Sequence, residues 1–152
     1  MTFFVMFRPN NRQRAKSLSL GTNNGAGQQG RVLVVEDDHS SRRALLMLLK
    51  LRGFETTHAC NLAEALEQLK SRPSVVLLDL MLPDGNGSTV LDYIRRNNLP
   101  IRVAVTSGAC NWESLLGDGP AKPDAFFGKP LHIERVMEWL SDRADAFSRA
   151  DV

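Results

Sequence analysis

The chain has 152 residues, 43% of them hydrophobic, a length that fits one globular domain and leaves too little for a second well-packed core. The formal net charge is +2, but four of the 19 basic residues lie in residues 1–30, which hold no acid, so the remainder carries 15 basic against 17 acidic residues and does not indicate a nucleic-acid-binding body. Two cysteines are too few for a disulfide framework, and no apolar run approaches the ~20 residues of a membrane span, so we expect a cytoplasmic protein without membrane insertion.

Residues 1–30 are expected to form a flexible N-terminal tail. From Asn10 to Gly30 the chain consists mainly of Asn, Gln, Gly, Ser and Arg, a composition with few side chains to bury. This composition leaves open whether the tail is an inert extension or a docking arm. We expect the folded domain at residues 31–147 and a short C-terminal tail at residues 148–152.

The first predicted unit is a strand, an acidic turn and a helix. Arg31–Val35 is a short run of mostly β-branched apolar residues, typical of a strand that is buried on both faces. It stops at the acidic residues 36–38, and residues 40–52 then carry leucines at helical spacing. Gly53 stands where the end of that helix favours a residue with positive φ.

The same alternation continues through the middle of the chain. Residues 54–59 are predicted as a strand, and Asn61 with Glu64 three residues later resembles the capping pattern of a helix start. Residues 74–78 form a second fully buried strand, again followed by an acid, Asp79. A turn and a further helix are predicted before the next strand.

Of the last two predicted strand–helix units, the fourth has a weak helix signal and the fifth a clearer one. After a predicted strand at residues 101–105, residues 109–123 contain two glycines and two prolines, so only a short helix at residues 112–116 fits. A strand at residues 125–127 and a helix after Pro130 complete the pattern. Five strand–helix units imply an α/β domain whose parallel sheet is covered by helices on both faces.

Polar side chains stand at the ends of four predicted strands. They are Glu36, Asp37, Asp79, Thr106, Ser107 and Lys129. Ligands of such sheets bind outside the carboxyl ends of the strands, so these groups are expected to converge. Crowded carboxylates repel one another unless a cation screens them, and Mg²⁺ prefers oxygen ligands. A screened carboxylate can attack phosphorus, while a lysine and a hydroxyl stabilise the phosphoryl oxygens. Each residue alone is weak evidence, but the joint arrangement predicts phosphoryl-group chemistry.

Four blocks of sequence resemble the receiver domain of bacterial response regulators, the phosphoacceptor module of two-component, chemotaxis and phosphorelay signalling. The blocks are residues 34–38, 78–85, 105–107 and 126–130, within a match from about Arg31 to Leu140. The resemblance implies a flavodoxin-like (βα)5 fold, a doubly wound five-stranded parallel sheet with strand order 2-1-3-4-5. It would carry a shortened or irregular fourth helix here, which leaves the usual partner surface of the family in doubt.

The resemblance also implies roles for the acidic residues. Asp79 would be the phosphoacceptor, and Mg²⁺ would be bound by Glu36, Asp37 and Asp79, with Asp37 as the direct ligand of the acidic pair. The backbone carbonyl of Met81 would be a further metal ligand. Asp38 is expected to cap the following helix.

Three other residues are assigned by the same resemblance. Thr106 and Lys129 would contact the phosphoryl group, and Lys129 would pair with the Asp79 carboxylate beforehand. Phe126, three residues before the lysine, would be the switch aromatic that turns inward when Thr106 moves toward the phosphate. A receiver catalyses its own phosphorylation and dephosphorylation and is a signalling phosphoacceptor rather than a conventional enzyme.

The expected partners are a histidine kinase or a histidine phosphotransfer protein, which donates the phosphoryl group, and a downstream effector protein. No direct contact with nucleic acid is expected, and a homodimer is left open. Few residues follow Leu140, so a stand-alone receiver that acts through protein contacts is favoured. The alternatives are a non-phosphorylated docking module or a receiver fragment of a larger regulator. A haloacid-dehalogenase-type phosphohydrolase would need an aspartate where Met81 stands.

Overall fold

A computed structural model describes residues 30–142, so the predicted tails, apart from Gly30, and residues 143–147 lie outside the described residues. In chain order the elements are β1 (Val32–Val35), α1 (His39–Leu51), β2 (Thr56–Ala59), α2 (Leu62–Gln68), the 3₁₀ helix η1 (Leu69–Ser71), β3 (Val75–Asp79), β4 (Met81–Leu82), β5 (Gly85–Asn86), α3 (Ser88–Arg96), β6 (Arg102–Ser107), α4 (Trp112–Leu116), β7 (Ala125–Gly128) and α5 (Ile133–Ser141). Within this part of the chain no helix has the length and apolar character to cross a bilayer.

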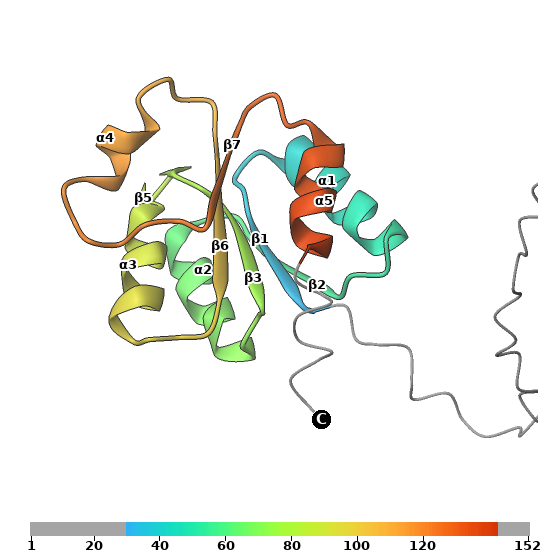
Figure 1. Cartoon of the computed structure of the whole chain (residues 1–152), viewed down its shortest axis with the longest axis horizontal. Coiled ribbons are helices and arrows are strands. Elements are labelled where there is room, and N and C mark those ends of the chain that lie inside the picture. The colour runs from blue at the N-terminus through green and yellow to red at the C-terminus, as the bar shows by residue number, and fades with distance from the viewer. Residues whose placement is uncertain (1–29, 143–152) are drawn as a thin grey trace, which may run out of the picture.

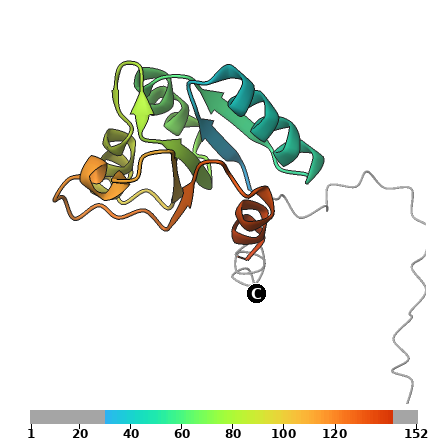
Figure 2. The ribbon, with the colours of Figure 1, turned by 90° about the horizontal axis from the view of Figure 1, so that it is seen from above.

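Five strands form one parallel sheet in the order β2-β1-β3-β6-β7. Because β6 and β7 are its fourth and fifth strands along the chain, this is the predicted order 2-1-3-4-5 of the flavodoxin-like fold. Figures 1 and 2 show α1 and α5 on one face of the sheet and α2 and α3 on the other. The predicted doubly wound α/β architecture is therefore confirmed.

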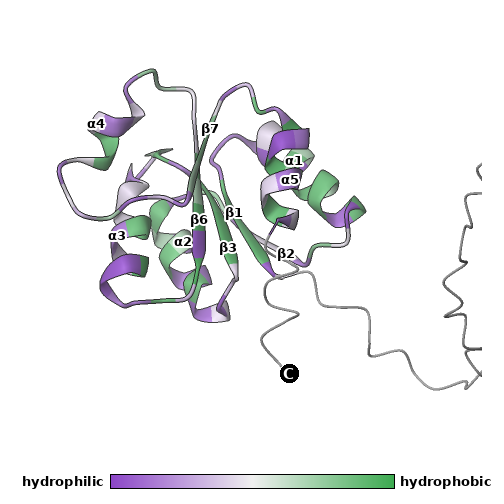
Figure 3. Ribbon diagram, in the orientation of Figure 1, coloured by the Kyte–Doolittle hydropathy of each residue, from purple (hydrophilic) through white to green (hydrophobic). Residues whose placement is uncertain are grey.

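Alternate residues of each central strand face opposite helix layers. In β1, Val32 and Val34 pack in the cluster formed with α1 and α5, whereas Leu33 and Val35 pack with α2 and α3. All four are fully buried, and each such aliphatic side chain stabilises the fold by about 1.5–3 kcal/mol. Figure 3 shows hydrophobic residues along most of the central strands and both hydrophilic and hydrophobic residues on the surrounding helices.

Two predicted strand boundaries were wrong by two residues. β2 begins at Thr56 rather than at residue 54, because its ladder with β1 starts at the pair Val32 and Thr56. β6 continues to Ser107 instead of ending at residue 105, because its last residues still pair with β3 and β7. The predicted turn after Asp79 is part of a small antiparallel hairpin formed by β4 and β5.

The predicted helix signals are confirmed in three places. Gly53 follows α1 with φ 87°. The Asn61 side chain accepts a hydrogen bond from the N–H of Glu64 at 2.8 Å, and Asp38 accepts one from the N–H of Ser41 at 2.7 Å. The fourth helix has only five residues, as the glycines and prolines after it indicated.

Candidate functional site

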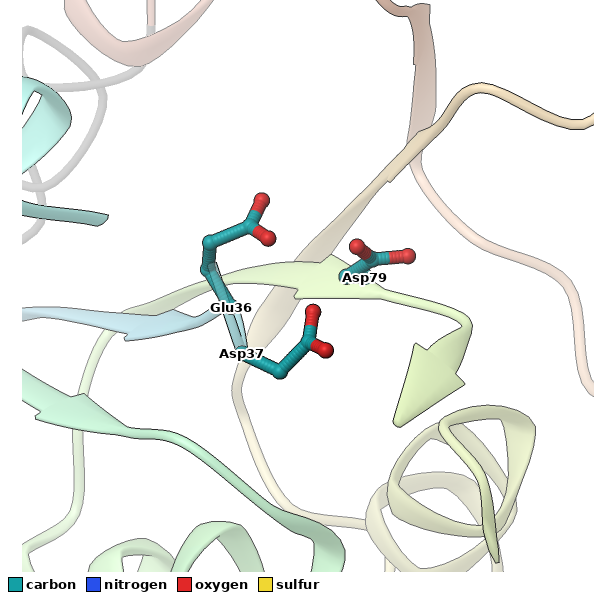
Figure 4. A group of neighbouring side chains, drawn as sticks. All are labelled: Glu36, Asp37 and Asp79. Carbon is teal, nitrogen blue, oxygen red and sulfur yellow. The ribbon is translucent and has the colours of Figure 1, made fainter. Parts of the chain in front are cut away.

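Three carboxylates meet at the carboxyl edge of the sheet. Glu36 and Asp37 lie in the loop between β1 and α1, and Asp79 is the last residue of β3. Each offers an oxygen atom within 4.8 Å of the others. Figure 4 shows the three side chains gathered at the ends of β1 and β3. Glu36 and Asp79 are only 4% and 5% exposed, whereas Asp37 is exposed to solvent. The sequence therefore placed these acids correctly at one site.

The parallel register brings the acids together. Val35 of β1 is paired with Leu78 of β3, so the residues that follow them, Glu36 and Asp79, lie side by side at the same edge. The backbone N–H of Glu36 also donates to the carbonyl of Ala59 at 3.1 Å. Strand register and this last hydrogen bond fix where the acidic loop leaves the sheet.

Lys129 joins two of the three acids. It follows β7, and its Nζ donates to Asp79 Oδ2 at 2.7 Å and to Glu36 Oε2 at 2.6 Å. The contact with Asp79 is the one that the family resemblance implied, while the contact with Glu36 was not predicted. The backbone N–H of Lys129 donates to the carbonyl of Ser107 at 2.9 Å, which holds the lysine close to β6.

Burial and pairing oppose each other at the ion pairs. Burial raises the pKa of Glu36, and the hydrogen bond and charge of Lys129 reduce that rise without cancelling it. Burial acts to lower the pKa of Lys129, but its hydrogen bonds to Asp79 and Glu36 outweigh this effect and leave its pKa raised. The lysine therefore stays protonated at neutral pH and supplies one positive charge beside three carboxyl groups.

The neighbouring strand β6 contributes two hydroxyl groups to this edge. Thr106 is buried and is paired in register with Asp79 on one side and with Phe127 on the other. Ser107 is also buried, and its Oγ accepts a hydrogen bond from the N–H of Ala109 at 3.2 Å. Of the two, Thr106 is the residue that is paired with Asp79 in the sheet.

Met81 and Phe126 lie in different surroundings. The backbone N–H of Met81 donates to Asp79 Oδ1 at 3.0 Å, and the Met81 side chain is 63% exposed. Phe126, in β7, stacks on Trp112 of α4 with ring centroids 4.3 Å apart and an interplanar angle of 16°. The structure therefore gathers Glu36, Asp37, Thr106, Lys129 and Met81 around Asp79, while the ring of Phe126 packs against α4.

Gly87 is a supporting residue that the sequence analysis missed. A Cβ atom at Gly87 would lie 2.2 Å from the carbonyl oxygen of Asp79, and the Gly87 N–H donates to the carbonyl of Leu80 at 2.8 Å. Only glycine allows this close approach of two backbone segments. The sequence showed Gly87 in a glycine-rich turn, but not what it would touch.

Asp84 is a second such residue. Its carboxylate accepts hydrogen bonds from the N–H groups of Leu62 at 2.6 Å and of Ala63 at 3.0 Å, at the start of α2. The bond from Leu62, followed by that from Ala63, lowers the pKa of Asp84. This carboxylate caps a helix that begins 22 residues earlier in the chain, a contact that no local pattern indicates.

The donor set fits a hard divalent cation. Carboxylate oxygens are the ligands that Mg²⁺ prefers, and three of them converge with one ammonium group nearby, which leaves a net negative charge at the site. Such a cluster is compensated more fully when a cation binds. The three acids are therefore consistent with a receiver-type metal site.

Comparison with known proteins places the chain in a family. The profile of the response regulator receiver domain matches residues 32–140. The chain is 33% identical over 112 residues to the probable transcriptional regulatory protein TcrX of Mycobacterium tuberculosis, covering 73% of this chain and 48% of that protein. It is 36% identical over 103 residues to a cyclic di-GMP phosphodiesterase of Thermotoga maritima, covering 68% of this chain and 28% of that protein.

A solved structure has the same fold. The signal receiver domain of a putative LuxO repressor protein from Vibrio parahaemolyticus superposes with a TM-score of 0.67 at 27% identity, covering 81% of this chain and 98% of that one. The chain thus matches nearly all of a separate receiver domain, but it spans less than half the length of the two curated relatives. More than half of each of these two relatives lies outside the matched region.

Proposed function

The chain belongs to the response regulator receiver domain family, and on this basis we propose that it accepts a phosphoryl group on Asp79 from the phosphohistidine of a histidine kinase or a histidine phosphotransfer protein. One observation carries the proposal: the buried Asp79 carboxylate pairs with Lys129 and lies within 4.8 Å of two further acids at the carboxyl edge of the sheet. A buried ion pair of this kind serves chemistry better than stability, because desolvation offsets much of its attraction.

The transfer step follows from the positions of the side chains. A carboxylate oxygen of Asp79 attacks phosphorus, the bond from phosphorus to the donor imidazole nitrogen breaks, and its electron pair remains on that nitrogen. Lys129 then neutralises the phosphoryl oxygens, and the Thr106 hydroxyl donates a hydrogen bond to them. Hydrolysis of the aspartyl phosphate is a separate reaction at the same site, in which water attacks phosphorus, the bond from phosphorus to the Asp79 oxygen breaks, and inorganic phosphate leaves.

The acids beside Asp79 are assigned two roles, metal binding and the positioning of Lys129. We assign Glu36, Asp37, Asp79 and the backbone carbonyl of Met81 to a bound Mg²⁺, which when present screens the negative charge that a phosphoryl group meets here. Glu36 also holds Lys129, through the 2.6 Å ion pair. This shared pairing keeps the ammonium group within reach of the reacting carboxylate before transfer.

The signal is proposed to leave through a conformational change. Thr106 moves toward the phosphoryl group, and Phe126 then leaves its stack on Trp112 and turns inward. Protein contacts in the cytoplasm carry the output, in keeping with the slightly acidic balance of residues 31–152. We take residues 31–147 as the receiver; action as a stand-alone receiver and action as part of a larger regulator remain alternatives.

Intact-protein mass spectrometry tests the acceptor. The wild-type protein is incubated with acetyl phosphate with and without Mg²⁺, beside Asp79→Asn and Asp38→Asn. We expect one Mg²⁺-dependent phosphoryl group on the wild type and none on Asp79→Asn. The control Asp38→Asn should be phosphorylated, because Asp38 caps α1 and asparagine also caps helices. A wild-type protein that is folded by circular dichroism but gains no mass would overturn the proposal and favour a docking module.

A further inference from the structure

Arg42 hydrogen-bonds to the backbone of the acidic loop. It lies near the start of α1, and its Nη1 donates to the carbonyl of Glu36 at 2.7 Å and to the carbonyl of Asp37 at 3.1 Å. The backbone N–H of Arg42 donates in addition to the carbonyl of Asp38 at 2.9 Å. One residue of α1 therefore contacts all three peptide groups of the loop that carries the acids.

These carbonyls lie beyond the end of the sheet ladder. β1 ends at Val35, so Glu36 and Asp37 begin a loop in which a carbonyl group needs a partner other than a neighbouring strand. Glu36 is 4% exposed, which leaves water little room to replace a lost donor. The guanidinium group, with several donors in a fixed plane, can hold two carbonyls at once.

The charge of Arg42 has opposing effects at its position. A cation near the N-terminus of a helix opposes the helix dipole and repels a metal ion at the acidic pocket, but it also attracts the carboxylates of that pocket. The two hydrogen bonds to the loop are the specific contacts that the structure shows.

We propose that Arg42 is a positioning residue for the carboxylates of Glu36 and Asp37. Its guanidinium fixes the two peptide groups from which these side chains project, and so keeps their oxygens converged with those of Asp79. The inference rests on the proposed function, because it concerns the acids assigned there to a metal ion. It assigns Arg42 no contact with the phosphoryl group.

A Mg²⁺ titration distinguishes a positioning role of Arg42 from an effect of its positive charge. Amide signals of the acidic loop are followed by NMR while Mg²⁺ alone is added to wild type, Arg42→Ala and Arg43→Ala. Removing a residue that orients metal ligands by hydrogen bonds typically weakens metal binding about 10-fold or more. We expect a loss of this size for Arg42→Ala. If only the charge mattered, Arg42→Ala would bind Mg²⁺ more tightly than wild type, because a repelling cation is gone. An unchanged or higher affinity in Arg42→Ala would overturn the inference.

Arg43→Ala is the matched control. Arg43 is the next residue on α1, is exposed and makes no side-chain hydrogen bond within residues 30–142. Its substitution removes the same charge and leaves the loop contacts intact. We therefore expect its Mg²⁺ affinity to equal or slightly exceed that of wild type, and a loss as large as that of Arg42→Ala would count against positioning by Arg42.

A readout without metal keeps the test independent of Mg²⁺ binding. The ¹³C carbonyl shifts of Glu36 and Asp37 in the metal-free protein should change in Arg42→Ala, change less in Arg42→Lys, which retains a donor, and stay as in wild type in Arg43→Ala. Unchanged carbonyl shifts in a folded Arg42→Ala would overturn the inference. Failure of the proposed function is a separate result, namely a wild-type protein that acetyl phosphate does not phosphorylate.

Discussion

Two regions of the molecule are held by different interactions. Around Asp79 the backbone belongs to paired strands, the side chains are buried, and Lys129 connects two acids through ion pairs. Between α4 and β7, no backbone–backbone hydrogen bond of the described chain involves residues 118–123. That segment is held by side chains, chiefly the bonds from Arg95 to the Lys122 carbonyl and to Asp124.

Because the two regions are held by different contacts, the acceptor site and the expected output surface depend on different parts of the structure. The acceptor site depends on strand register and crossovers, which the whole core supports. The segment after α4 depends on a few side-chain contacts with Arg95, and α4 itself contacts β7 through the Trp112–Phe126 stack. Shortening the fourth helix therefore leaves the acceptor geometry in place and changes the surface through which a receiver would signal.

Amide hydrogen exchange should show the largest contrast. We expect the amides of β3 to exchange only on global unfolding and those of residues 118–122 to exchange with little protection, because protection follows hydrogen bonding of the backbone. Native-state exchange measured by NMR gives both rates in one experiment. Strong protection across residues 117–124 would remove the contrast.

Lys129→Ala should affect only the first region, and strongly. Removing a group that stabilises charge in a transition state typically slows a reaction about 10²–10³-fold, and we expect a loss of this size in phosphorylation by acetyl phosphate. Mg²⁺ binding should persist, since the variant carries one positive charge fewer near the acids. The control Lys122→Ala changes an exposed lysine of the second region and should react at the wild-type rate.

A pair of glycine substitutions compares the packing of the two regions. Gly87→Ala places a methyl group against the backbone of Asp79, and such overpacking costs about 1–3 kcal/mol in the free energy of unfolding. Gly119→Ala meets nothing within 4 Å and should be close to neutral. Urea denaturation measures both values. Equal stabilities of the two variants would show that the backbone can shift away from residue 87.

The aromatic stack should contribute stability but not acceptor chemistry. Trp112→Leu removes a ring contact of the kind that contributes about 0.5–1.5 kcal/mol. A double-mutant cycle with Phe126→Leu isolates the coupling between the two rings. Phosphorylation of Trp112→Leu by acetyl phosphate should proceed as in wild type, and a rate as low as that of Lys129→Ala would make the two regions one functional unit.

The smallest effect is expected from pH at the Asp84 cap. Its pKa lies below the ordinary value of 3.8, so in acid the unfolded chain binds a proton at Asp84 before the folded protein does. The stability from this carboxylate is complete above that value and is lost as the pH falls through the lower folded pKa. Acid unfolding of Asp84→Asn should therefore be less steep below about pH 4. Asp118→Asn changes an exposed acid of the second region, leaves the Asp84 cap in place and serves as the control.

Local patterns predicted the elements well and their ends less well. Apolar runs such as Val32–Val35 indicate a buried strand from their composition alone, and Gly53 and Asn61 indicate a helix end and a helix start. The predicted end of β6 was wrong because Thr106 and Ser107 are polar, and polar residues usually indicate that a buried strand has ended. They remain in the strand because β3 and β7 offer backbone partners beside them.

The sequence by itself determined the class of fold and the acids, hydroxyl and lysine of the candidate site, because side-chain type and periodicity are properties of neighbours along the chain. The strand order came from resemblance to a family rather than from local pattern. Tertiary structure alone decided which groups touch: Lys129 and Glu36 are 93 residues apart and meet only through strand register and crossovers. The same holds for Gly87 against Asp79, because a close approach of two backbones leaves no signal in either local sequence.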